Sequence, residues 1–292
     1  NRDVLQILAI VVSVLCVFSV LPALLSLPER PVRETVPHSE EPNSEEQSGY
    51  RFREVFRNGP FVRVLIAMTV FLLSLGILAS LVIPWMRNVV GLRESQAWGF
   101  MLMQGIITVA AVPMWVVLAN RYTKHRMLCV SFLGAATTAV IGSILIHNVD
   151  AGYLAGITFV VVAFTGVWSA GALVLPAAMT PDAVDLDTLR SGRERAGMYY
   201  AVMGMGLKLA IGVGIALATV AVSLIGFDMK PGAAAAPGIA PWVTFFTLVL
   251  PALINLLILP LMWNFPLGAD RHAIVARALK RRRSRVAALV TP

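Results

Sequence analysis

The sequence predicts an all-α integral membrane protein with seven transmembrane helices. Hydrophobic residues make up 58% of the 292 residues and charged residues only 14%, and the mean hydropathy is +0.77. These values lie far outside the composition of soluble globular proteins. The apolar residues are also gathered into seven stretches of roughly 20 residues or more, the length that crosses a hydrocarbon core about 30 Å thick.

The first predicted span is residues 1–27, in which positions 4–27 are predominantly apolar. This stretch has neither the basic start nor the small-residue cleavage site of a signal peptide. Because the chain begins with Asn1 and enters a full-length span at once, we expect it to start inside a longer protein. Residues 28–60 follow as a polar linker, rich in proline and glutamate and then in arginine, which predicts an extended, solvated segment.

Six further apolar stretches predict a six-helix bundle over residues 61–268. The expected spans are residues 61–84, 96–119, 127–147, 152–177, 197–227 and 240–264. A basic tail, residues 269–292, ends the chain and carries four consecutive cations at 280–283. Such a run is expected to bind anionic lipid headgroups.

The distribution of Lys and Arg predicts the orientation of the chain. Most of the 24 basic residues lie in four segments, 28–63, 120–126, 181–195 and 271–285, which alternate with connections that carry few cations. By the positive-inside rule, the four basic segments face the cytoplasm, the N-terminus lies outside and the C-terminus lies inside. We therefore expect a multi-pass protein of the plasma (inner) membrane whose charge serves topology, with no nucleic-acid partner.

One cation, Lys208, lies inside the sixth predicted span. With about 1.5 Å of rise per residue, Lys208 is roughly 16 Å from the start of the span at Gly197, close to the middle of the bilayer. An ionisable side chain at that depth costs at least about 2.5 kcal/mol, so it is expected to face a cavity or a partner inside a bundle. Lys208 is therefore the first candidate for a transport site.

Small residues form two stripes along this same span, because residues four apart share a helix face. One stripe contains the lysine: Gly204, Lys208, Gly212 and Ala216. The other lies on roughly the opposite side: Gly206, Ala210, Gly214 and Ala218. We expect the second stripe to pack closely on another helix and the first to leave open space around the ammonium.

A charged segment, residues 180–195, leads into the sixth span. Thr180 as N-cap, Pro181 in the first position and Asp182 in the first turn predict the start of a helix. Asp182 and Asp185 share a helix face, and charges of both signs return at 193–195. Two interpretations stay open: a self-neutralised hairpin, or charges that change partners when an inner gate opens.

The segment also carries a recognisable pattern: Pro181-Asp182-Ala183-Val184-Asp185, Arg190, Gly192-Arg193-Glu194-Arg195, Gly197, Tyr199-Tyr200 and Lys208. With the basic loop at 120–126, this pattern resembles the melibiose-carrier-like cation symporters. They are the glycoside/pentoside/hexuronide branch of the major facilitator superfamily. The resemblance covers nearly the whole chain and assigns it to helices six to twelve of a twelve-helix fold, the carboxyl-terminal half.

The resemblance implies cation-coupled symport of a sugar or glycoside by alternating access. It implies Lys208, with Tyr200 as a weaker candidate, near the sugar and cation sites, and Asp182, Asp185 and Arg193 as inner-gate charges. No carboxylate is embedded in the seven predicted spans. A coupling sodium ion or proton would therefore be bound mainly by the missing amino-terminal bundle.

Other classes of protein are less consistent with these residues. A seven-helix receptor or retinal-binding protein shares the helix count, but no intramembrane carboxylate is available as counter-ion to Lys208. A non-transporting half-transporter that acts as an interaction protein also stays open. An enzyme is not expected, and neither is a metal or cofactor, because the sequence has no Ser/His/Asp set, Gly-rich phosphate loop or metal-ligand spacing.

Overall fold

The structure is a computed structural model that describes residues 13–14, 17–18, 21, 53–192, 195–230, 233, 235–236, 238–268, 274–275, 277–279 and 281. The chain divides into two units, Asn1–Gln47 and Ser48–Pro292. In the first unit, the described residues are helical: Ser13, Val14, Val17, Phe18 and Leu21. The rest of the expected first span, the linker as far as residue 52 and most of the basic tail lie outside the described residues.

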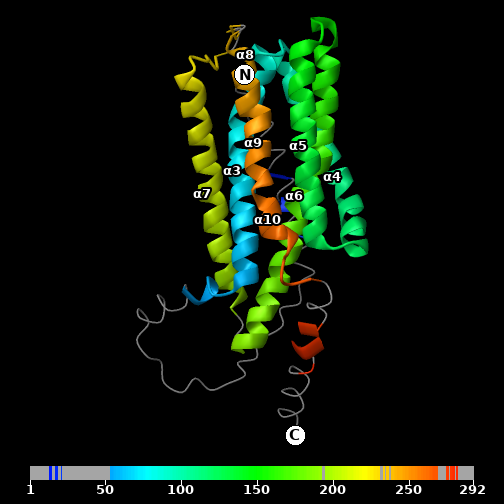
Figure 1. The fold of residues 1–292 in the computed structure, drawn as a ribbon, viewed down its shortest axis with the longest axis vertical. Helices are drawn as coiled ribbons and strands as arrows, with labels where there is room; N and C mark the ends of the chain where they lie inside the picture. Colours follow the sequence, from blue (N-terminus) through cyan, green and yellow to red (C-terminus); the bar gives the residue numbers. More distant parts are fainter. Residues whose placement is uncertain are drawn as a thin grey trace. The chain divides into compact units, whose positions relative to one another are not determined.

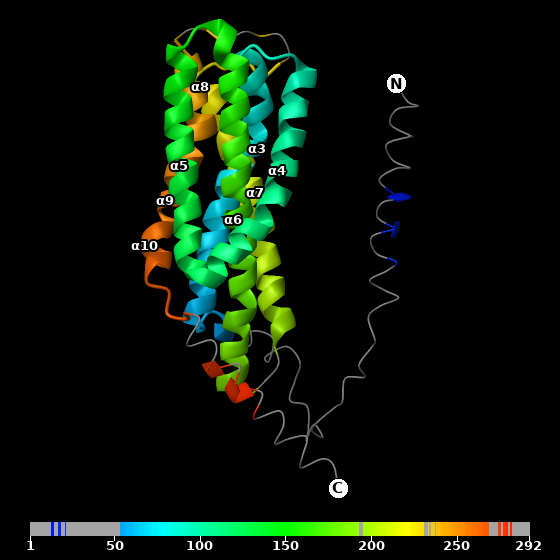
Figure 2. The same ribbon diagram turned by 90° about the vertical axis from the view of Figure 1, so that its right-hand side faces the viewer.

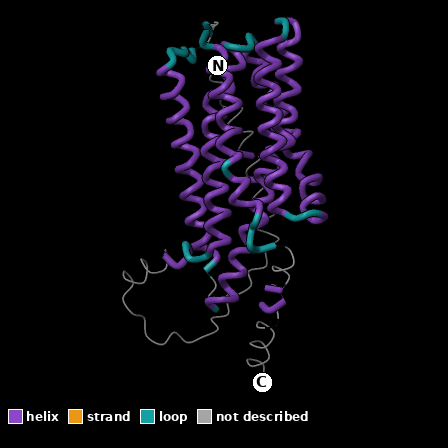
Figure 3. The backbone as a smooth tube through the Cα atoms, viewed as in Figure 1, coloured by secondary structure: helices purple, strands orange, loops and turns teal. Residues whose placement is uncertain are grey.

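The described part of the second unit consists of helices and their connections, without strands (Figure 3). Six spans are long and apolar enough to cross a membrane. They are α3 (Gly59–Asn88), α4 (Glu94–Arg121), α5 (Lys124–Asn148), α6 (Leu154–Ser191), α7 (Ala196–Leu224) and the segment Ala240–Trp263. The last segment comprises α8 (Ala240–Thr244), a π-helical turn η2 (Phe245–Val249), α9 (Leu250–Leu256) and α10 (Ile258–Trp263). The six spans predicted after the linker are confirmed.

Helix α3 is the central helix of this unit. It packs along α7 over most of its length and also contacts α6 and α9 (Figures 1 and 2). Its start is defined by Asn58, whose side chain accepts a hydrogen bond from the Phe61 amide, and by Pro60 in the first turn. Both are favourable at a helix N-terminus because they satisfy or remove unpaired amide groups. The residues just before α3 lie near the end of α6 and the start of α7, since Asn58 donates to the Ala183 carbonyl and Glu54 pairs with Arg195.

Helices α4, α5 and α6 form a second packed group. Gly166 of α6 lets the backbone of α4 approach closely, since an added Cβ would lie 2.9 Å from the Gln104 carbonyl oxygen. At the same crossing, the Thr108 hydroxyl lies 2.8 Å from the Gln104 carbonyl and 3.1 Å from the Gly166 carbonyl. Short side chains and interhelical hydrogen bonds of this kind stabilise helix pairs in membranes.

Helix α6 contradicts one prediction. The sequence predicted a new helix beginning at Thr180, but α6 runs without a break from Leu154 to Ser191 through Pro176 and Pro181. The Thr180 hydroxyl donates to the Pro176 carbonyl (3.0 Å), and the Lys124 ammonium donates to the Ala178 carbonyl (3.0 Å). Each proline removes only its own amide donor, and a helix can continue through this loss where neighbouring helices pack against it. Asp182, Asp185 and Asp187 therefore belong to the last turns of α6, not to a separate hairpin.

Candidate functional site

The stripe that contains Lys208 lies on an open face of α7. Lys208 and Gly212 are exposed, and a Cβ added to Gly204 or Gly212 would meet no atom within 4 Å. Tyr200, two turns before Lys208 on the same face, is 49% exposed. The structure thus places both predicted transport-site residues, Lys208 and Tyr200, on one face. The glycines beside Lys208 are open as predicted, but neither of the two pockets described below is lined by Lys208, so a cavity around the ammonium stays a prediction.

The opposite stripe of α7 is in contact with α3. Ala210 and Ala218 are buried, and a Cβ on Gly214 would lie 2.2 Å from the Leu73 carbonyl oxygen. From the other side, a Cβ on Gly76 of α3 would lie 2.4 Å from the Ile211 carbonyl oxygen. The two backbones touch here because neither has a side chain at the crossing. The predicted packing stripe is confirmed.

Within the described residues, no hydrogen bond or ion pair involves the Lys208 ammonium, which is exposed on α7. An ammonium group inside a membrane span requires a polar partner or water. The open face therefore has both the space and the unsatisfied donor that a polar ligand needs, and any protein partner for it lies outside the described residues.

A cluster of charges lies where α6 ends and α7 begins, and we call it the charge junction: Glu54, Asp187 and Arg195. Gly192, with φ of 73°, ends α6 in a left-handed conformation. Arg195, just before α7, forms an ion pair with Glu54 through Nη1 and lies 3.2 Å from Asp187 Oδ2 through Nη2. Its side chain is only 13% exposed. One guanidinium therefore connects the residues before α3, the end of α6 and the start of α7.

Two neutral side chains support the charge junction. The Asn58 amide donates to the Ala183 carbonyl at 2.8 Å and lies 3.4 Å from the Tyr199 hydroxyl. Tyr199 is fully buried and packs edge-on against Phe61, with ring centroids 4.6 Å apart. These contacts hold the starts of α3 and α7 against α6. The junction borders a polar pocket of about 600 Å³, lined by Glu54, Arg57, Asn58, Asp187, Arg190, Ser191 and Arg195.

The three predicted gate residues have different positions. Asp182 is buried and forms an ion pair with Lys124 at 2.6 Å, which joins α6 to the start of α5. Asp185 lies half-buried on α6, and Arg193 lies outside the described residues. Of the predicted gate residues, Asp182 thus pairs with Lys124. The cation at the centre of the charge junction is Arg195, which is not one of the predicted gate residues. Sequence reasoning missed Lys124, Glu54 and Asp187 as partners, because their contacts bring together residues far apart in the chain or across a helix end.

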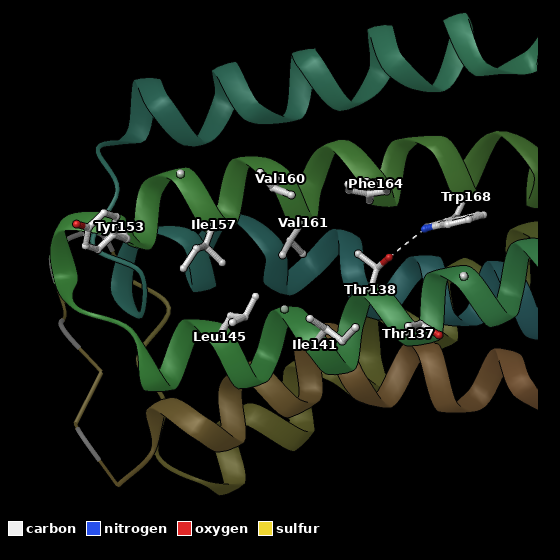
Figure 4. A pocket seen from close by; sticks show the side chains of 13 residues that line it. Thr137, Thr138, Ile141, Leu145, Tyr153, Ile157, Val160, Val161, Phe164 and Trp168 are labelled. Carbon is white, nitrogen blue, oxygen red and sulfur yellow. Dashed lines mark hydrogen bonds between the residues drawn. The ribbon is translucent and has the colours of Figure 1, made fainter.

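A second pocket, between α5 and α6, is apolar (Figure 4). It has a volume of about 610 Å³, and its walls include Gly142, Val161 and Phe164. At one end, Trp168 Nε1 donates to Thr138 Oγ1 at 2.9 Å, so these two polar groups already satisfy each other. A site for a polyhydroxylated solute needs several convergent polar groups. This pocket therefore suits hydrocarbon and is not our candidate for a sugar site.

The chain is similar to a curated protein that is itself uncharacterized. The chain is 26% identical over 220 residues to an uncharacterized symporter of Synechocystis sp.. The match covers 72% of this chain and 38% of the relative, so the chain spans well under half the length of the relative that it matches.

The family comparison covers most of the chain. A family described as MFS/sugar transport protein matches residues 1–269, which include the open face of α7 and the charge junction. The match agrees with the resemblance seen in residues 181–208 and with six apolar spans. It also identifies a multi-pass membrane protein of a transporter family. On this match over nearly its full length, the chain belongs to the MFS/sugar transport protein family.

Proposed function

We propose that this chain is the carboxyl-terminal part of a cation-coupled symporter that carries a sugar or glycoside across the plasma membrane by alternating access. The family match and the symporter relative support transport in general. The observation that carries the finer proposal is Lys208, an exposed ammonium on an open face of an apolar span, without a partner in the described residues. Such a group is stable at bilayer depth only where water, ligand or another polar group reaches it.

The chemistry of the open face suits a polar solute. The Lys208 ammonium offers up to three hydrogen-bond donors, and the Tyr200 hydroxyl can donate and accept. The glycines at 204 and 212 leave room between and beyond these groups. We therefore propose that Lys208 and Tyr200 bind one of two kinds of partner. They bind hydroxyl groups of the solute, or they bind an acidic group that also holds the coupling ion, which is sodium or a proton.

The remaining assignments follow from this proposal. Residues 1–27 would be the last helix of an amino-terminal bundle, 28–60 a cytoplasmic linker, 61–268 the carboxyl-terminal bundle and 269–292 a cytoplasmic tail. The absent amino-terminal bundle would cover the open face of α7 and supply most ligands of the coupling ion. Asp182 with Lys124, together with Asp185 and Arg193, would form the inner gate, whose charges change partners as the inner end opens.

The test is uptake of radiolabelled sugars and glycosides by cells that express the full-length protein carrying this chain, with and without sodium and proton gradients. We expect gradient-dependent uptake of at least one solute and its loss or uncoupling in Lys208→Ala, with membrane insertion unchanged. Lys230→Ala is the matched control, because Lys230 lies in the exposed connection after α7. Wild-type uptake and coupling in Lys208→Ala would contradict the proposed role.

A further inference from the structure

The apolar pocket between α5 and α6 is a long, narrow groove (Figure 4). Along α6 its lining residues run from Tyr153 to Trp168. At about 1.5 Å of rise per residue this stretch is about 22 Å long, so a volume of about 610 Å³ gives a mean width of about 6 Å. An α-helix with its side chains is about 10 to 12 Å wide. The groove is therefore too narrow for another transmembrane helix and wide enough for one hydrocarbon chain.

The polar groups along the groove restrict what can occupy it. Trp168 Nε1 donates to Thr138 Oγ1 at 2.9 Å, and the Thr137 hydroxyl donates to the Leu133 carbonyl at 2.9 Å. These groups therefore have partners within the protein. The Tyr153 hydroxyl, in contrast, forms no hydrogen bond with the described residues, and this side chain is 68% exposed. The groove thus suits a molecule that is apolar along its length and polar only at the Tyr153 end.

The Tyr153 end of the groove lies at a membrane surface. Tyr153 belongs to η1 (Ala151–Tyr153), in the connection between α5 and α6, two helices that are long and apolar enough to cross a membrane. Tyrosine is enriched at this level, because its ring lies among the headgroups while its hydroxyl stays hydrated. From Tyr153 the groove continues for about 22 Å, more than half of a hydrocarbon core roughly 30 Å thick. It therefore runs from the headgroups past the middle of the bilayer core.

We propose that this groove binds one acyl chain of a membrane phospholipid, with the headgroup beside Tyr153 and the end of the chain near Trp168. An acyl chain has no polar group along its length, and the headgroup at its start supplies partners for the Tyr153 hydroxyl. This lipid site is separate from the open face of α7, which carries Lys208, and its occupation does not depend on the proposed transport function.

Glycines shape both the floor and the mouth of the groove. On α5, Gly142 allows close packing on α6, since an added Cβ would lie 2.6 Å from Val161 Cγ2. On α6, Gly156 leaves the groove open, since an added Cβ would meet no atom within 4 Å. Large apolar side chains form the rim, where Val160 and Phe164 are each 51% exposed. A chain in the groove contacts both helices at once and so gains more dispersion contacts than a chain on a flat helix face.

The first measurement counts the phospholipids that the purified full-length protein carrying this chain retains. The protein is reconstituted in vesicles of phosphatidylethanolamine and phosphatidylglycerol, extracted in a mild detergent and weighed by native mass spectrometry. We expect the wild type to retain one phospholipid whose occupancy falls about fivefold or more in Gly156→Leu, because the new side chain fills the groove and removes its contacts. Gly105→Leu is the matched control and should leave retention unchanged. Gly105 is exposed on α4, and an added Cβ there also meets no atom within 4 Å.

The second measurement locates the retained chain. Phosphatidylcholine with a diazirine at the end of one acyl chain is added to the same vesicles and activated by light. We expect labelling concentrated at Thr137 and Trp168, at the deep end of the groove, and about fivefold less of it in Gly156→Leu. Ile144 is the internal control, since it is 57% exposed on α5 but does not line the groove.

These results decide whether the groove is a lipid site. Equal retention by the wild type and Gly156→Leu would overturn it, and so would equal labelling of Ile144 and Trp168. If Gly156→Leu does not fold, Val160→Phe fills the groove from its rim and should give the same two losses. Absence of solute uptake would contradict the proposed function alone, because both measurements are made without solute.

Discussion

The two faces of α7 are built from similar residues and have opposite surroundings. Both carry glycine and alanine at four-residue intervals. On one face, Gly214 leaves so little space that a Cβ would lie 2.2 Å from the Leu73 carbonyl oxygen, and on the other, Gly212 has no atom within 4 Å. Small residues alone therefore do not tell whether a helix face is packed or open.

The polar residue on each face makes the difference. The open face carries Lys208, which cannot be packed against α3 without losing its solvation, and the packed face carries no ionisable side chain in the middle of the span. Burial of the apolar stripe positions the helix, and the lysine then faces away from α3 by necessity. The packed face and the proposed transport site thus lie on opposite sides of one helix.

The largest effect is expected for the two adjacent tyrosines at the start of α7. Tyr199 is fully buried against Phe61, whereas Tyr200 is 49% exposed on the Lys208 face. Tyr199→Ala should lower the free energy of unfolding by about 3 to 5 kcal/mol, because it leaves a cavity and removes a ring contact. Tyr200→Ala should lower it by less than about 1 kcal/mol while reducing uptake. Both are measured by SDS titration in mixed micelles and by transport; equal losses of stability would contradict the assignment of faces.

A smaller effect is expected for the paired glycines of α7. Gly214→Ala should destabilise the protein by about 1 to 3 kcal/mol, since its methyl group would separate α7 from the α3 backbone. Gly212→Ala should instead be neutral or stabilising by about 0.5 to 1 kcal/mol, because alanine favours the helix and meets no neighbour. Thermal unfolding of both variants in detergent tests the contrast. A stable Gly214→Ala protein would mean that α3 and α7 are not in contact.

Much of the fold could be predicted from the sequence, because hydrophobic length and four-residue periodicity are local properties. The six spans after the linker and both stripes of α7 are present in the structure. The predicted helix start at Thr180 was wrong for a reason that the sequence does not show. Lys124, 56 residues earlier than Thr180, donates to the Ala178 carbonyl and pairs with Asp182, so contacts with the start of α5, a part of the chain distant in sequence, hold this turn of α6.

The candidate site was predictable only in part. The depth of Lys208 in an apolar span made it the first candidate for a transport site, and the family resemblance added Tyr200 as a weaker one. Arg195 and Arg193 could not be ranked from spacing, since both precede the same span by a few residues. The contact of Arg195 with Glu54 depends on how the start of α3 approaches α6 and α7, which only the three-dimensional arrangement gives.

The smallest effect is expected at Gly206, and its sign sharpens the comparison of the two faces. Gly206 belongs to the packed stripe, but a Cβ there would lie 3.6 Å from Leu65 Cδ1 and 3.8 Å from Thr69 Oγ1, which are ordinary contact distances. Gly206→Ala should therefore stabilise the protein by about 0.5 to 1 kcal/mol, because alanine favours the helix and adds a contact. Gly214→Ala, about two helical turns later, should have the opposite effect. SDS titration of the two variants side by side checks this. If Gly206→Ala destabilises the protein as much as Gly214→Ala does, the close approach of α3 and α7 extends to the start of the packed stripe. The open space along α7 would then lie on the Lys208 face alone.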